Sequence, residues 1–211
     1  TASPISVTGP TGLRTTLTYG SLADASSGRY VNDRADATNK AVYPLVDLTI
    51  ASPVVITTTS DVGVGASTLQ TQYAYKGLKA ALDGRGMLGF RQTVQQNTAA
   101  NGAALSVWTD YLLGEPYAGV ARRSQTRLGA WNAPTAQLLS TTTSTYCDRT
   151  SLSNPADTAT TGAGDTFTDT APCASTAKVR RPYLRKTVES GTDLDGTALP
   201  TVTTVNTYNN Y

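Results

Sequence analysis

Polar and apolar residues alternate over much of the chain, which is the pattern of half-buried β-strands. In residues 68–76, one face of the expected strand carries Leu69, Thr71, Tyr73 and Tyr75, and the other carries two glutamines and an alanine. The dipeptide Asp83-Gly84 follows, and it favours a tight hairpin because glycine adopts positive φ without steric cost. The sequence therefore predicts two extended segments hinged at 83–84, the second opening in the glycine-spaced run 84–90.

Further strands are expected on both sides of this hairpin. The alternating or β-branched stretches are 14–19, 41–50, 54–59, 90–96 opposite 105–111, 122–128, 138–146, 178–188 and 201–208. Turn signals separate them at short intervals, and residues 21–40 are polar and irregular. About ten strands of this kind predict an all-β fold in which antiparallel hairpins form a long, twisted, meandering sheet.

The composition supports strands covered by neutral polar side chains. Charged residues make up 15% of the chain, against roughly 25% in typical soluble domains. The 17 basic and 15 acidic residues give a net charge of +2, so no general affinity for nucleic acid is expected. No apolar run approaches the roughly 18 residues of a membrane span.

The two cysteines lie in a segment rich in Ser, Thr, Asp and Gly. A disulfide between Cys147 and Cys173 would close a loop of about 25 residues and stabilise the fold by roughly 3 kcal/mol. Two unpaired thiols in a reducing compartment are the alternative. We expect residues 1–211 to form a single β segment with a loop insertion at 146–175, excised from a longer chain.

Candidate catalytic and cofactor sites are weak. The chain has no histidine, which excludes Ser-His-Asp and Cys-His nucleophile systems and histidine-containing metal sites. Gly84, Gly86 and Gly89 fit the dinucleotide-binding spacing, but a strand-like pattern follows them where a helix is required. Asp83, Asp110 and Glu115 could supply a glycosidase pair, although nothing fixes their separation. The prediction is no catalytic, cofactor or metal site.

Three other clusters have structural interpretations. The basic residues between Lys178 and Lys186 suggest a solvated edge strand that is protected by charge from further pairing. Asp193-Leu194-Asp195-Gly196 suggests a hairpin turn rather than a calcium loop. The aromatic residues Trp108, Tyr111, Tyr117 and Trp131 suggest cross-strand packing, with a carbohydrate site as the alternative.

The central hairpin also resembles a known family. The run Tyr-x-Tyr-x-Gly-Leu-Lys, followed by Asp-Gly-Arg-Gly-x-Leu-Gly-Phe, is similar to a segment of RHS/YD-repeat proteins. These are large secreted chains, among them polymorphic toxins and B-component-like chains of insecticidal toxin complexes, whose repeats wind into a hollow β-shell. The matching residues are Tyr73, Tyr75, Gly77, Asp83, Gly84, Arg85, Gly86, Leu88, Gly89 and Phe90.

The resemblance implies a structural role. The segment would be part of a secreted shell that encloses and delivers a toxin or effector domain, and the motif residues would serve packing and turns without catalysis or a cofactor. Its partners would be the rest of its own chain and the enclosed effector, with self-association through edge strands. An adhesin or extracellular filament subunit at the cell surface is the alternative. A lectin or carbohydrate-active enzyme would need a deep aromatic-lined cleft.

Overall fold

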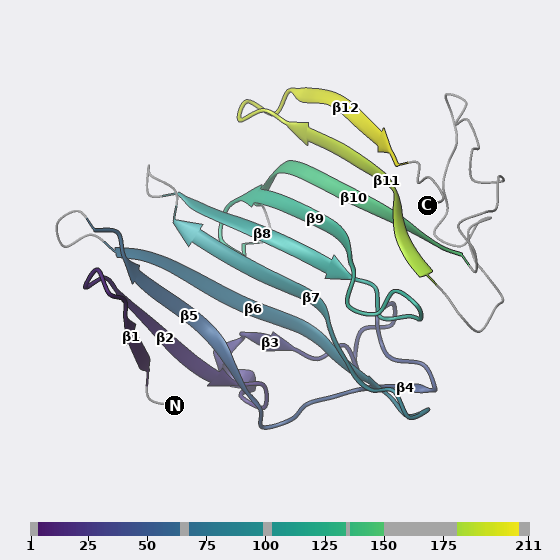
Figure 1. Ribbon diagram of the computed structural model, residues 1–211, viewed down its shortest axis with the longest axis horizontal. Helices are drawn as coiled ribbons and strands as arrows, with labels where there is room; N and C mark the ends of the chain where they lie inside the picture. The colour runs from purple at the N-terminus through teal and green to yellow at the C-terminus, as the bar shows by residue number, and fades with distance from the viewer. Residues whose placement is uncertain (1–3, 64–67, 99–102, 134–135, 150–180, 207–211) are drawn as a thin grey trace.

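The computed structural model describes residues 4–63, 68–98, 103–133, 136–149 and 181–206. They form one open twelve-stranded sheet in which neighbouring strands pair in the order β1-β2-β5-β6-β7-β8-β9-β10-β11-β12, while β3 and β4 pair with β6 (Figure 1). All pairs are antiparallel except β3 with β6. The predicted all-β meander is confirmed. The strands are β1 (Ile5–Thr8), β2 (Arg14–Ser21), β3 (Tyr30–Val31), β4 (Leu45–Asp47), β5 (Pro53–Asp61), β6 (Thr68–Ala81), β7 (Gly86–Thr98), β8 (Ala104–Tyr111), β9 (Ala121–Leu128), β10 (Gln137–Arg149), β11 (Arg181–Thr192) and β12 (Ala198–Val205).

The predicted hairpin lies at the centre of this sheet. Strands β6 and β7 pair from Thr71 with Asn97 to Ala81 with Gly86, and residues 82–85 form the connection. Gly84 and Gly86 have φ values of 97° and 75°, a backbone conformation that residues other than glycine rarely adopt. The Asp-Gly turn therefore sets the end of the two longest neighbouring strands.

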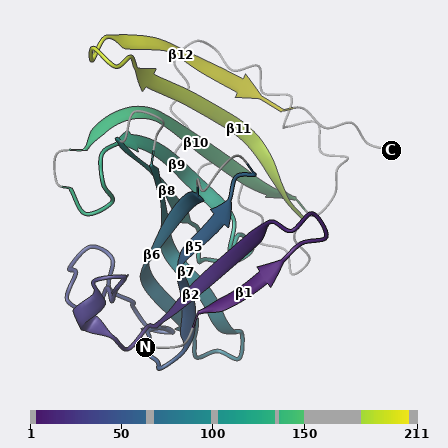
Figure 2. The ribbon, with the colours of Figure 1, turned by 90° about the vertical axis from the view of Figure 1, so that its left-hand side faces the viewer.

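Three strands pair in succession with one edge of β6. Of the residues of β6, β5 pairs with Thr68–Gln72, β3 with Tyr75 and Lys76, and β4 with Lys79–Ala81. Both short strands come from residues 22–50, which leave the sheet after β2 and return before β5. We call this stretch the 22–50 segment. Figure 2 shows the curvature of the sheet and the 22–50 segment projecting from it.

The hydrophobic core is small and lies where the 22–50 segment covers the sheet. Leu22, Tyr30 and Leu78 are buried together, and Leu48, Ile50, Val54, Tyr75 and Phe90 pack against them. A single sheet buries a face only where another layer covers it. Away from the segment, both outer strands are exposed along their whole length.

Some sequence expectations need correction. β11 is not an edge strand, because β12 pairs with it from Lys186 to Thr192, and Arg185 is only 5% exposed. The solvated charged edge is therefore wrong for the described part of that cluster. The short strand β3 was not expected, and of the expected stretch 41–50 only Leu45–Asp47 forms a strand, β4. Strand β10 continues to Arg149, past the predicted start of the insertion at 146. Residues 150–180 lie outside the described part of the chain.

Candidate functional site

The RHS-like motif residues divide between a turn and the core. In the turn, the Arg85 guanidinium binds the Asp83 carboxylate, with Nη2 2.6 Å from Oδ2, and its Nη1 lies 3.4 Å from Glu115. The hydrogen bond from Arg85 lowers the pKa of Asp83. Gly89, further along β7, also has a positive φ of 101°. These contacts are those of a stabilised turn.

The aromatic motif residues pack beneath the 22–50 segment. The Tyr75 and Phe90 ring centroids are 4.8 Å apart, and the Tyr75 hydroxyl donates a 2.7 Å hydrogen bond to the Val55 carbonyl. Burial raises the pKa of Tyr75. Tyr73 and Leu88 are half-buried in β6 and β7. The motif therefore joins the central hairpin to its covering layer.

Gly77 provides space for a carboxylate. Its φ is 61°, and a Cβ at this position would lie 2.0 Å from Oδ2 of Asp33. No side chain larger than hydrogen fits there without moving Asp33. The glycine of the motif is thus linked to a buried acid that the sequence pattern did not indicate.

Asp33 belongs to a buried ion network. It accepts two hydrogen bonds from Arg91, at 2.7 Å from Nε and 2.8 Å from Nη2, and its Oδ2 lies 3.3 Å from Nζ of Lys79. The same ammonium group binds the Asp47 carboxylate and donates to the Asn39 carbonyl at 2.7 Å. The side chains of Asp33, Lys79 and Asp47 are 2%, 6% and 6% exposed.

The network stabilises its charged forms. Burial acts to raise the pKa of Asp47, but hydrogen bonds from Lys79 and the Ala41 amide outweigh it, and the pKa is lowered. The hydrogen bonds to Asp33 raise the pKa of Arg91. Because Asp33 and Asp47 belong to the 22–50 segment and Lys79 and Arg91 to the central hairpin, the network attaches one layer to the other.

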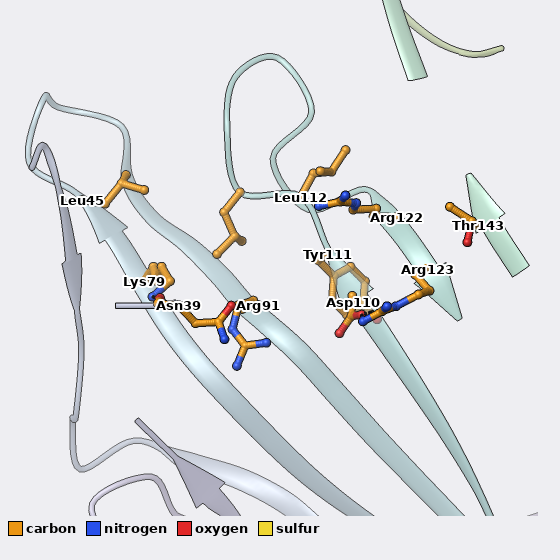
Figure 3. A pocket seen from close by; sticks show the side chains of 11 residues that line it. Asn39, Leu45, Lys79, Arg91, Asp110, Tyr111, Leu112, Arg122, Arg123 and Thr143 are labelled. Carbon is orange, nitrogen blue, oxygen red and sulfur yellow. Dashed lines mark hydrogen bonds and ion pairs between the residues drawn. The ribbon is translucent and has the colours of Figure 1, made fainter. Parts of the chain in front are cut away.

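A pocket of about 480 Å³ adjoins this network. Figure 3 shows Lys79 and Arg91 on one side of it and Asp110, Arg122 and Arg123 on the other. Asp110 accepts 2.7 Å and 2.6 Å hydrogen bonds from Arg123 Nε and Gln92 Nε2 on its two oxygens. Three leucines complete part of the wall: Leu45, Leu112 and Leu113.

Cations also stack on two tryptophans. Lys76 Nζ lies 4.7 Å from the ring centroid of Trp108, and Arg127 lies 5.6 Å from the same ring. Arg29 lies 5.2 Å from Trp131. Burial, and then the nearby Arg91, lower the pKa of Lys76. The contacts of Trp108 come from the strands β6 and β9 and are of the cross-strand kind, whereas Trp131 follows β9 and contacts a residue of the 22–50 segment.

The acidic residues considered for catalysis lie in ion pairs. Asp83 and Glu115 both contact Arg85, and Asp110 contacts Arg123. Asp195 accepts a 2.8 Å hydrogen bond from the Thr197 amide within the β11–β12 turn. Within the described ranges, no group of three His, Cys, Asp or Glu side chains is placed to hold a metal ion.

Cys147 is completely buried in β10, with Nη1 of Arg185 3.9 Å from its Sγ. Cys173 lies outside the described residues, so the Cys147–Cys173 bridge remains a prediction. In the part of the chain that the structure describes, no helix has the length and apolar character needed to span a membrane.

Sequence reasoning did not bring Asp33, Asp47, Lys79 and Arg91 together. The sequence does indicate that two of these charged residues are buried. Asp47 lies in the apolar run Leu45–Leu48, and Lys79 lies between Leu78 and Ala80 in a strand. A charged residue in a buried strand requires a partner. The identity of that partner follows only from the fold.

Comparison with protein families gives a match over the first half of the chain. Residues 6–114 match the model of the insecticide toxin TcdB middle/N-terminal region. This match covers about half of the chain, including β2 to β8, the 22–50 segment and the ion network. No curated protein matches the chain.

Proposed function

Because the chain belongs to the family of the insecticide toxin TcdB middle/N-terminal region, we propose that it is a structural segment of a secreted RHS-repeat shell. In this role it encloses and helps to deliver a toxin or effector domain and performs no catalysis itself. The rest of its own chain and the enclosed effector are its partners. The family match supports the proposal, and the RHS-like hairpin lies within the matched residues 6–114.

The open edges of the sheet carry most of the structural support. β1 and β12 contain no charged residue, and every residue in both strands is exposed. Edge strands of isolated domains are usually protected by charge, bulges or covering layers. The uncharged edges, the four-residue β1 and the eight-residue β12, are available for continued pairing with further strands, as a shell wall requires. Pro200 is the one residue of β12 that cannot donate a backbone hydrogen bond to such a strand.

Electron cryo-microscopy of the longer natural chain that contains this segment would test the proposal. We expect the sheet to continue beyond β1 and β12 into a closed wall around an internal effector. Limited proteolysis should leave that effector intact until the wall is opened by denaturant. A solid filament without an internal compartment would overturn the shell and favour the adhesin or filament alternative, which the same exposed edges would also serve.

A further inference from the structure

The turn end of the central hairpin exposes several large apolar side chains. Val42, Tyr43, Leu82 and Met87 are between 60% and 84% exposed, and they are four of the five most exposed large apolar residues in the described ranges. Val42 and Tyr43 precede β4, whereas Leu82 and Met87 flank the Asp-Gly turn. Single exposed apolar residues are normal, but a group of them marks an interaction surface.

Backbone contacts hold these residues at one place. The Leu82 amide donates a 2.9 Å hydrogen bond to the Pro44 carbonyl, and β4 pairs with the last residues of β6. Figure 1 shows β4 beside the shared end of β6 and β7. We call residues 42–45 and 82–87 the hairpin end. Because it lies at the ends of strands, backbone pairing along β1 or β12 cannot cover it, and a partner must contact its side chains.

A groove of about 530 Å³ opens at the hairpin end. Val42, Pro44 and Leu45 form an apolar part of its wall, together with Leu113 from the connection between β8 and β9. The volume lies within the range of sites for organic ligands. The groove can therefore bury apolar side chains of a ligand.

The charged residues of the groove are two carboxylates and one guanidinium, Asp83, Glu115 and Arg85. Asp83 accepts hydrogen bonds from Nε and Nη2 of Arg85 at 3.0 Å and 2.6 Å. Glu115 lies 3.4 Å from the remaining Nη1 nitrogen, and its side chain is 57% exposed. One cation therefore serves two carboxylates, and the Glu115 carboxylate keeps lone pairs for a further donor.

We propose that the groove at the hairpin end docks a protein segment in which a lysine or arginine stands between apolar residues. The site goes beyond the proposed shell role and does not depend on it. The apolar side chains of the segment contact Val42, Pro44 and Leu113, and its cation pairs with Glu115.

The charge of the groove decides between classes of partner. A nucleic acid or an acidic segment would be repelled by Asp83 and Glu115. A purely apolar segment would cover the Glu115 carboxylate without supplying a donor, which costs free energy because the charge loses water. A lipid surface is disfavoured because the Asp83–Arg85 ion pair lies in the turn between Leu82 and Met87 and would have to leave water with them.

Binding of a fluorescent peptide to the intact protein tests the site. The peptide is Leu-Leu-Lys-Leu-Leu on a Gly-Ser linker, and fluorescence anisotropy measures its binding. We expect saturable binding that salt weakens only in part, since apolar contacts are not screened. Peptides with Glu in place of Lys, or with Ser in place of every Leu, should bind roughly tenfold more weakly.

Two pairs of matched variants locate the bound peptide. Val42→Ser should weaken binding by roughly tenfold, the effect of losing one buried valine side chain. Val62→Ser, the same change at an exposed valine after β5, should leave binding unchanged. Glu115→Gln should weaken the Lys peptide by roughly threefold, the scale of one exposed ion pair, and should strengthen the Glu peptide. Glu189→Gln, at the other glutamate of the chain, should do neither.

Selective effects of Val42→Ser and Glu115→Gln, with circular dichroism showing that each variant is folded, would support the proposal. Absence of saturable binding, or equal effects of a variant and its control, would overturn it. Binding lost in Val202→Lys but kept in Val42→Ser would also overturn it, because the peptide would then be an added strand along β12.

Light scattering of the protein without peptide tests the remaining occupant of the groove. Association that Val42→Ser abolishes would make a second copy of this chain the partner and would overturn the assignment of a basic segment. Association unaffected by Val42→Ser would support that assignment. None of these results depends on whether the longer chain forms a closed shell.

Discussion

At the scale of single residues, Gly77 is the described glycine at which an added Cβ would make the shortest contact. A Cβ there would overlap the Asp33 carboxylate at 2.0 Å, and the residue also has a positive φ of 61°. We expect Gly77→Ala to destabilise the fold by about 3 kcal/mol, combining backbone strain with overpacking. Equilibrium unfolding in urea measures this difference.

Gly84→Ala is the matched control for that experiment. Gly84 has a larger positive φ of 97° but open space around it. Gly84→Ala should therefore destabilise the fold only by the backbone strain, about 1 kcal/mol. Equal effects at the two glycines would show that contact with Asp33 is unimportant and that φ alone explains both.

Asp47 makes the stability dependent on acid. Its pKa is lowered in the folded protein, because hydrogen bonds from Lys79 and Ala41 outweigh the opposing effect of burial. The contribution of the Asp47 carboxylate to the free energy of unfolding is therefore fully present above the unfolded pKa of about 3.9. It is lost as pH falls through the lower pKa of the folded protein. We expect the free energy of unfolding to decrease below about pH 4 for this reason.

Asp47→Asn tests that dependence. The substitution leaves the buried Lys79 with one carboxylate fewer, so we expect a loss of about 3 kcal/mol at neutral pH. The loss should shrink in acid, where the wild-type residue is itself protonated. Urea unfolding from pH 2 to pH 7 measures both curves. Parallel curves at all pH values would contradict a titrating role for Asp47.

At the scale of elements, the 22–50 segment is held to β6 by backbone pairing, the ion network and one tyrosine hydroxyl. The Tyr30 hydroxyl donates to the Leu48 carbonyl and accepts a 3.2 Å hydrogen bond from the Leu78 amide. Its contacts therefore span the covering layer and the hairpin. Burial raises the pKa of this hydroxyl, as expected for a group enclosed between two layers.

Tyr30→Phe should loosen the segment. The change leaves the Leu48 carbonyl and the Leu78 amide without this partner, and we expect a loss of about 2 kcal/mol. Hydrogen exchange should rise at 45–48 and at 78 more than in β8 and β9. Tyr43→Phe is the control, since Tyr43 is 84% exposed. Uniform exchange over the whole sheet would show that the segment does not open separately.

The parts of the fold that sequence predicts are those governed by local patterns. The β6–β7 hairpin followed from alternation and Asp83-Gly84, and the β11–β12 turn followed from Asp195-Gly196. Strand β3 was missed because two residues show no period, and it is ordered by pairing with β6. Strand β4 lies within the expected stretch 41–50, but its pairing with β6 limits it to three residues. The partners of Lys79 were missed because Asp33 and Asp47 lie 46 and 32 residues before it in the printed sequence.

At the scale of the whole molecule, the exposed outer strands β1 and β12 are the surfaces through which association is expected. β12 is uncharged and exposed throughout, with Val202 56% exposed. An uncharged exposed edge is a template for pairing with another chain. We expect the isolated protein to associate through this edge in a concentration-dependent way, and light scattering with analytical ultracentrifugation to detect the larger species.

Val202→Lys should suppress that association. A lysine within an edge strand disfavours pairing because the charge must be desolvated or brought against its own copy. Leu194→Lys adds the same charge in the β11–β12 turn, at a residue that is 67% exposed, and should leave association nearly unchanged. Equal solubilisation by both lysines would mean that net charge controls association. Suppression by Val202→Lys alone would show that the molecules associate through β12, the edge at which a shell wall would pair with its next strand.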